Sequence, residues 1–144
     1  MPYTIAYYNS VICTFVQKLY NGSEVRKLVK CLMIKPEYIM EFLDGEKNVE
    51  YRTWKTDYRG DILLAACATP YTHGFVACVA NLKDIKYDNT EKIYAWVLDD
   101  IRVVKPIKVV GKVRLFDTDI EQYEELDSDE AVDAAYAEAT WIEK

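Results

Sequence analysis

The stretch that decides the fold is GEKNVEYRTW, residues 45–54. It follows PEYIMEFLD at residues 36–44, where a proline stands at the first helical position and the apolar residues fall on one helical face. The alternation in the second half of the stretch predicts a strand. Residues two apart on a strand share a face, so Glu50, Arg52 and Trp54 point the same way. The stretch therefore predicts a helix, a turn and a strand that bring a carboxylate, a guanidinium and an indole to one side.

The rest of the chain is rich in short apolar and alternating runs, which are typical of strands. We expect strands at residues 28–34, 49–54, 62–68, 75–82, 93–98 and 101–116, the last of them broken near Pro106. Residues 62–68 form a continuous small-apolar run, which predicts a strand that is buried on both faces. We expect turns at Gly60-Asp61, His73-Gly74, Asp88-Asn89 and Asp99-Asp100. Gly111 inside the last strand pattern indicates a bulge or a tight bend.

The ends of the chain give weaker and more open patterns. Residues 3–8 fit a strand, while residues 11–20 fit either a helix or a strand. Asp127 is placed to cap a helix over residues 128–142, whose apolar positions share one face. The expected fold class is α+β and mostly β, a small β-barrel of five to six strands with flanking helices.

Charge is divided unevenly along the chain. The chain has a formal net charge of −6, but residues 117–144 alone carry −10, so the rest carries +4. A mildly basic body is compatible with a phosphate-bearing partner. The acidic segment either restrains the affinity of the body for polyanions or serves as a solubilising surface helix, and it is also the one feature that points to a protein-interaction adaptor.

Composition narrows the class of protein. The 144 residues suffice for one domain with a real core, and no apolar run approaches the length of about 20 residues that spans a bilayer. The first residues lack the pattern of a signal peptide, so we expect a cytoplasmic protein that does not act at a membrane. The four cysteines show no close pairing of the C-x-x-C kind, which favours buried free thiols, and we expect no metal and no cofactor. The oligomeric state stays open.

The residues of the opening stretch resemble a known family. Gly45-x-Lys47-x-x-Glu50-x-Arg52 is similar to the G-x-K-x-x-E-x-R signature of ASCH domains. Flanking blocks resemble the family in the same order: residues 30–35, 58–64, 74–82, 94–98 and 107–112. The resemblance divides the chain into an N-terminal extension at residues 1–27, an ASCH domain at residues 28–116 and an acidic C-terminal segment at residues 117–144.

The resemblance implies a PUA-like barrel with a cleft that binds RNA or a nucleotide-like ligand. The signature residues Lys47, Glu50 and Arg52 would line that cleft, and Trp54 on the same strand face is a candidate for stacking on a base. Some bacterial relatives are amidohydrolases on acetylated cytidine, with a Lys–Thr–Glu set. Their lysine matches Lys47, but their threonine falls at Glu50, so the set is not intact here. A ribonuclease activity has also been proposed for some members.

Two interpretations of the charged residues remain open at the level of the sequence. Lys47, Glu50 and Arg52 could form a ligand site, since arginine offers a planar fork for phosphate and a carboxylate accepts hydrogen bonds from amines or hydroxyls. They could also be a solvated ion cluster at a strand edge. A catalytic version uses Lys47 as a base or nucleophile with Glu50 as a proton shuttle. That version needs Lys47 to be turned away from the charge of Glu50.

Overall fold

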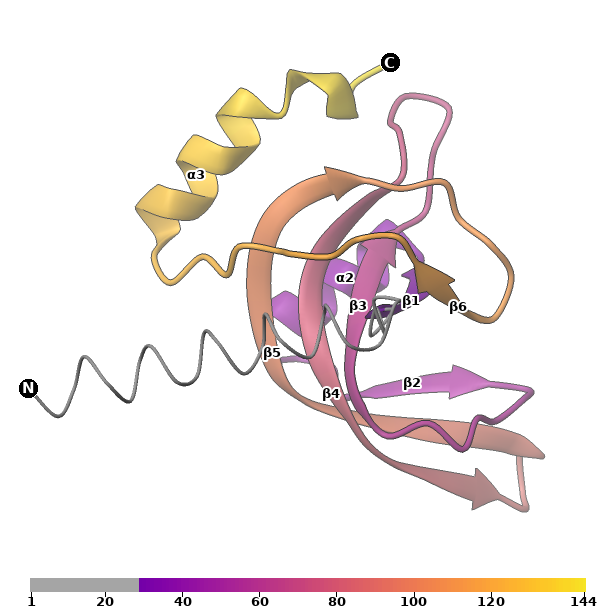
Figure 1. The fold of residues 1–144 in the computed structure, drawn as a ribbon. Helices are drawn as coiled ribbons and strands as arrows, with labels where there is room; N and C mark the ends of the chain where they lie inside the picture. The colour runs from indigo at the N-terminus through magenta and orange to yellow at the C-terminus, as the bar shows by residue number, and fades with distance from the viewer. Residues whose placement is uncertain (1–28) are drawn as a thin grey trace, which may run out of the picture.

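A computed structural model describes residues 29–144, which form one curved sheet with two α-helices (Figure 1). The elements, in chain order, are β1 (Val29–Ile34), α2 (Pro36–Leu43), β2 (Val49–Arg52), β3 (Gly60–Ala66), β4 (Phe75–Asp88), β5 (Ile93–Lys108), β6 (Leu115–Thr118), α3 (Asp129–Glu138) and a 3₁₀ turn (Thr140–Ile142). The fold is therefore mostly β, with six strands and flanking helices, as the sequence predicts. The strand expected at residues 3–8 and the helix or strand expected at residues 11–20 lie outside the described residues.

The six strands are arranged in the order β2-β5-β4-β3-β1-β6. β1 and β3 run parallel, and the other neighbouring strands run antiparallel. The sheet curls strongly in Figure 1, but β2 and β6 form its two edges and do not pair with each other. Residues 29–144 thus form an open curved sheet, and the closed barrel expected from the resemblance is not confirmed.

The curvature arises in β4 and β5, the two long strands. Their pairing shifts register three times, between Val76/Cys78, Val79/Asn81 and Leu82/Asp84. Each shift is a bulge, which bends a strand and increases its twist. The long strands can therefore stay hydrogen-bonded to each other while the sheet curls around its core.

The sequence predicts a turn at Asp99-Asp100 and a break near Pro106. Both predictions are wrong, because the pairing of β4 with β5 continues through the bulges. Asp99 and Asp100 lie within β5 instead of forming a turn, because the ladder to β4 continues on both sides of them and Asp100 absorbs the bulge with a φ of 51°. Pro106 does not end the strand, which continues to Lys108. It lies at another register shift, where its missing N–H costs no ladder hydrogen bond.

β3 is the centre of the core. Ile62, Leu64 and Ala66 belong to one buried cluster, and Leu63 and Ala65 belong to a second cluster on the other face of the sheet. The first cluster includes α2 and Trp96, and the second includes the apolar residues that follow β6. The sequence-based prediction of a strand buried on both faces is confirmed for residues 62–66, because both faces of this curved sheet are covered, whereas Cys67 and Ala68 lie beyond the end of β3.

Several local predictions can be compared with the structure. The helix at residues 36–44 and the strand at residues 28–34 are confirmed by α2 and β1, and a turn follows Asp88 as expected. Gly60 and Asp61 begin β3 instead of forming a turn. Gly111 lies in the loop between β5 and β6, because β5 has already ended at Lys108.

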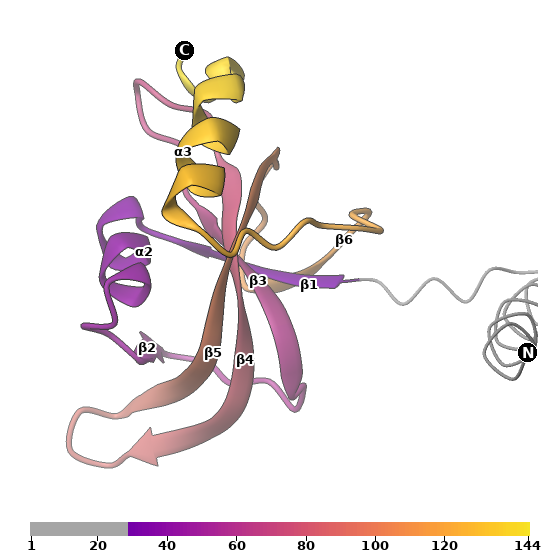
Figure 2. The same cartoon turned by 90° about the vertical axis from the view of Figure 1, so that its left-hand side faces the viewer.

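The acidic C-terminal segment packs along β5. The N–H of Leu126 donates to the carbonyl of Val103 at 2.8 Å, and the N–H of Lys105 donates to Glu124 at 2.9 Å. α3 then lies at the end of the sheet far from the β4–β5 hairpin (Figure 2). The N-cap of α3 is Ser128, whose hydroxyl accepts a hydrogen bond from the N–H of Ala131 at 3.1 Å. The expected cap at Asp127 is therefore off by one residue. At the other end, a 3₁₀ turn replaces the last turn of the expected helix.

Arg102 ties this segment to the sheet. Its guanidinium lies 3.0 Å from Asp61, 3.3 Å from Asp100 and 2.7 Å from Glu125. The side chain is only 26% exposed, so the three carboxylates are drawn together around one partly desolvated cation. Without the cation these carboxylates would face one another as like charges.

We expect Arg102→Ala to lower the free energy of unfolding by about 1–3 kcal/mol, the cost of leaving charged hydrogen-bond partners unmatched. Urea denaturation followed by circular dichroism measures it. The control is Lys83→Ala, which removes one exposed ion pair with Asp99 at 3.9 Å and should cost less than about 1 kcal/mol. Equal unfolding midpoints for the two variants would contradict the role given to Arg102.

Candidate functional site

The turn between α2 and β2 sets the position of the charged stretch. Gly45 has a φ of 77°, in the left-handed region that favours glycine at the end of a helix. Two residues later, the N–H of Lys47 donates to the carbonyl of Glu41 at 3.2 Å. β2 then pairs antiparallel with β5, which places Glu50 opposite Trp96. The glycine of the signature is thus the residue that lets the chain reverse into β2.

Three charged side chains of the stretch come together. The Lys47 Nζ lies 4.0 Å from Glu50 Oε2, and the Arg52 Nε lies 3.6 Å from Glu50 Oε1. Glu50 is 6% exposed, whereas its neighbour Tyr51 is 52% exposed. The strand alternation therefore turns Glu50 inward, and Lys47, whose direction the sequence left open, points toward it.

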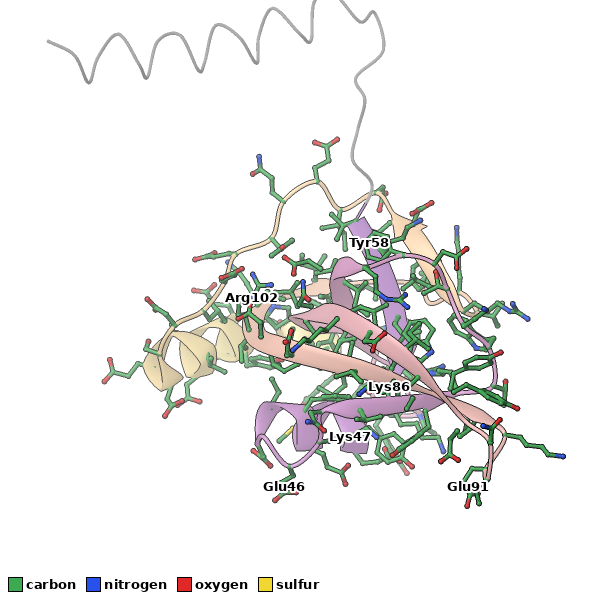
Figure 3. All side chains as sticks on the ribbon, turned by 90° about the horizontal axis from the view of Figure 1, so that it is seen from below. Glu46, Lys47, Tyr58, Lys86, Glu91 and Arg102 are labelled. Atoms are coloured by element: carbon green, nitrogen blue, oxygen red, sulfur yellow. The ribbon has the colours of Figure 1, made fainter. Side chains whose placement is uncertain are left out.

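Lys47 is also surrounded by aromatic rings. Its Nζ lies 4.8 Å from the ring centroid of Tyr38, 5.5 Å from that of Phe42 and 5.6 Å from that of Tyr51. Ring faces attract a cation, as does the carboxylate of Glu50. The amine is thus held between α2 and β2 (Figure 3) by groups that all favour a positive charge.

Arg52 links the charged stretch to β1. Its Nη2 donates to the carbonyl of Met33 at 2.8 Å. Its Nε and the Glu50 Oε2 are buried and have no hydrogen-bond partner within the described part of the chain. Burial raises the pKa of Glu50, against the opposing charges of Arg52 and Lys47. The two cations therefore compensate only part of the cost of burying this carboxylate.

A cleft of about 680 Å³ opens beside Arg52. Three parts of the chain line it: the neighbourhood of β1 and β2, the loop after β3, and the loop after β5. The lining residues are Met33, Arg52, Trp54, Cys67, Ala68, His73, Gly74 and residues 108–114. Arg52 and Trp54 of the predicted site belong to this lining, whereas Lys47 and Glu50 do not.

The lining is strongly one-sided in charge. It contains the cations of Arg52, Lys108, Lys112 and Arg114, and none of the residues that line the cleft is acidic. Desolvation and the charges of Lys108 and Lys144 lower the pKa of His73. A concave surface with clustered cations focuses a positive potential that attracts anions.

Trp54 forms a fixed wall of the cleft. Its ring meets Trp96 edge-on, with centroids 4.8 Å apart, and its carbonyl accepts the Trp96 Nε1–H at 3.2 Å. Trp96 is fully buried, as its apolar neighbours in the sequence indicate, while Trp54 is half-buried. Trp96 therefore fixes the position of Trp54, and Trp54 contributes to the lining of the cleft.

The C-terminal residues support the opposite wall. The N–H of His73 donates to the carbonyl of Ile142 at 2.7 Å, and the N–H of Lys144 donates to that of Tyr71 at 2.8 Å. The Lys144 Nζ also donates to the carbonyl of Thr69 at 3.0 Å. The end of the acidic segment thus extends the backbone pairing of the loop that forms this wall.

The sequence analysis missed the cations that follow β5. The sequence pattern predicts that residues 101–116 form a strand with a bulge at Gly111. In the structure, β5 ends at Lys108, and Lys112 and Arg114 lie in the loop that follows it. Gly111 lies against Met33, and a Cβ there would come within 2.9 Å of the Met33 side chain. A basic residue at every second to fourth position of K-V-V-G-K-V-R was the available signal.

The described residues also include three cysteines, one of which, Cys67, lines the cleft. No cluster of metal-binding side chains is found among residues 29–144. Cys31, Cys67 and Cys78 are free thiols, and burial raises the pKa of Cys31 and of Cys78 to about 12. These two buried thiols are poor nucleophiles because they resist ionisation. Cys13 lies outside the described residues.

Comparisons with known proteins identify the family of the chain. None of the helices described is long and apolar enough to cross a bilayer. No curated protein matches the sequence. Residues 32–144 match the ASCH domain, a range that holds the signature, both walls of the cleft and the acidic segment. The chain belongs to the ASCH domain family.

Proposed function

We propose that the chain binds RNA or a nucleotide through the basic cleft beside β2. The observation that carries this proposal is the charge of the cleft: four cations and no carboxylate line it, in a chain of net charge −6. The lining also holds an indole, which offers a stacking surface for a base. Membership of a family that is broadly associated with RNA binding agrees with this chemistry.

Arg52 and the cations after β5 have different roles in this proposal. Arg52 is held by Met33 and lies near Glu50, so its remaining N–H groups are presented in a fixed direction. A fixed planar fork suits bidentate recognition. Lys112 and Arg114 are exposed on a loop, and Lys112 acts as a phosphate contact.

The acidic segment does not compete with the ligand in this account. Its ion pairs that the structure describes join Asp117 to Lys30, Glu125 to Arg102, and Glu138 to Lys105, at 2.6, 2.7 and 3.6 Å. None of these three cations lines the cleft. The segment thus neutralises cations of the scaffold and leaves those of the cleft to a ligand.

Hydrolysis is the alternative function, with Lys47 and Glu50 as the catalytic pair. Lys47 needs a neutral amine to act as a base or nucleophile, yet the carboxylate and the three rings around it attract a positive charge. Neither residue lines the cleft. The arrangement favours binding over catalysis.

The binding proposal predicts that Arg52→Ala weakens the binding of a fluorescein-labelled single-stranded RNA by about 1–3 kcal/mol, the value of a bidentate contact. Lys112→Ala should weaken binding less and make the slope of log K against log salt shallower by about 0.7, one phosphate contact on a single strand. Fluorescence anisotropy across a salt series measures both effects.

The matched control for the lysine variant is Lys86→Ala, which removes the same charge from an exposed position on β4 outside the cleft. It should leave the salt slope unchanged. If Lys86→Ala and Lys112→Ala reduce the slope equally, binding depends on overall charge and the cleft is not the site.

Glu50→Gln tests whether the charged stretch serves stability or the site. Because burial raises the pKa of Glu50 above its ordinary value of 4.5, the folded state binds the proton more tightly than the unfolded state. The favourable contribution of this group is complete below about pH 4.5 and is lost as the pH rises through the raised pKa. We therefore expect the stability of Glu50→Gln relative to the wild type to increase with pH above 4.5.

Chemical denaturation at a series of pH values measures this difference. Glu46→Gln, at an exposed position in the same turn, is the control and should give a flat difference. A variant that loses stability relative to the wild type as the pH rises would show that the ionised carboxylate stabilises the fold. The charged stretch would then be a structural ion cluster.

A further inference from the structure

The guanidinium of Arg114 lies over the indole of Trp54 in the lining of the cleft. The guanidinium carbon lies 5.6 Å from the centroid of the Trp54 ring, and both residues line the cleft. Trp54 is anchored through Trp96, whereas Arg114 is exposed on the loop between β5 and β6. The pair therefore consists of one fixed flat surface and one exposed flat cation.

The distance between the Arg114 guanidinium and the Trp54 ring lies between one and two base-stacking distances. Stacked bases repeat about every 3.4 Å, so a base placed between two flat groups needs them about 6.8 Å apart. The 5.6 Å between Arg114 and Trp54 is wider than one stacking distance and about 1 Å short of two. A small outward movement of the Arg114 side chain opens a slot for one aromatic ring.

The backbone at Arg114 favours this presentation. Its φ of 64° lies in the left-handed region, which residues with a side chain rarely adopt. Arg114 lies directly before β6, whose first residue, Leu115, pairs with Leu32 of β1, and its guanidinium lies over Trp54. The neighbouring Val110 and Val113 are 84% and 89% exposed, so the same loop offers apolar as well as basic surface.

We propose that Trp54 and Arg114 bind one unpaired base between them, which makes single-stranded RNA the ligand class of the cleft. The inference rests on the proposed function and adds its substrate class. Lys108 and Lys112 line the same cleft and contact phosphates of the bound strand in this proposal. A duplex is a poor ligand, because its bases are already stacked and flipping one of them out costs free energy.

The test compares three probes with the full chain. The first is a short fluorescein-labelled oligouridine with one central adenosine, the second is the same strand with an abasic site at the centre, and the third is the first strand annealed to its complement. A parallel strand with 2-aminopurine at the centre reports stacking directly, because an adjacent indole quenches its fluorescence. The adenosine and abasic strands carry the same sugar–phosphate backbone, so the difference between them reports the base.

The wild type should bind the adenosine strand roughly 5- to 100-fold more tightly than the abasic strand, the range for stacking of one base on an aromatic side chain. Trp54→Leu and Arg114→Lys should each reduce this preference and the 2-aminopurine quenching. Arg114→Lys keeps the charge and leaves the core untouched, so it remains informative if Trp54→Leu folds poorly. Tyr87→Leu and Arg59→Lys, at exposed positions outside the cleft, are the matched controls.

The outcomes distinguish failure of the base slot from failure of the proposed RNA-binding function. Three results would each overturn the base slot and leave a charge-based RNA site. They are equal binding of the adenosine and abasic strands by the wild type, a preference that survives both variants, and duplex binding as tight as that of the single strand. Failure of the wild type to bind any of the probes would overturn the proposed function itself.

Discussion

The register between β2 and β5 is the constraint on which the site depends. β2 has four residues and lies at an edge of the sheet, so few hydrogen bonds define its position. Pairing of Glu50 with Trp96 and of Arg52 with Tyr94 turns the charged face inward. A slip of one residue would turn Tyr51 inward and expose Glu50 and Arg52. The buried Trp96 opposes such a slip, because it contacts both the ring and the carbonyl of Trp54.

Two groups of cations among the described residues have different surroundings. Lys30, Arg102 and Lys105 pair with carboxylates of the C-terminal segment and fix that segment to the sheet. The four cations of the cleft line an open volume, and one of them, Arg52, also lies 3.6 Å from Glu50. A chain with a negative net charge thereby keeps one strongly positive concave surface. The C-terminal residues contribute to it indirectly, through backbone pairing with the loop that forms one wall.

The sequence predicts the elements whose local pattern and tertiary environment agree. α2 has its proline start, its apolar stripe and its glycine end, and β3 is apolar throughout because the curled sheet covers both of its faces. Prediction failed where long-range pairing overrides a local signal. Asp99 and Asp100 are typical turn residues, yet the ladder between β4 and β5 absorbs them as a bulge. The strand pattern also says nothing of whether the sheet closes into a barrel.

The candidate site was predictable only in part, for the same reason. Alternation along β2 suffices to place Glu50, Arg52 and Trp54 on one face, since that depends on one strand alone. The cleft depends on two loops, at residues 67–74 and 109–114, that meet only after the sheet has curled. Whether Lys47 faces the cleft depends on a turn and three aromatic neighbours, and no strand rule governs it.

The most direct test of the account is an NMR titration of the isotope-labelled chain with a short single-stranded RNA. The largest shifts should appear at the indole N–H of Trp54, the guanidinium of Arg52 and the amides of residues 108–114, while the surroundings of Arg102 stay unchanged. Arg102 does not line the cleft, and Figure 3 shows it apart from Lys47, which lies next to β2. Shifts centred on Arg102 and α3, with the cleft silent, would contradict the claim that this cleft binds the ligand.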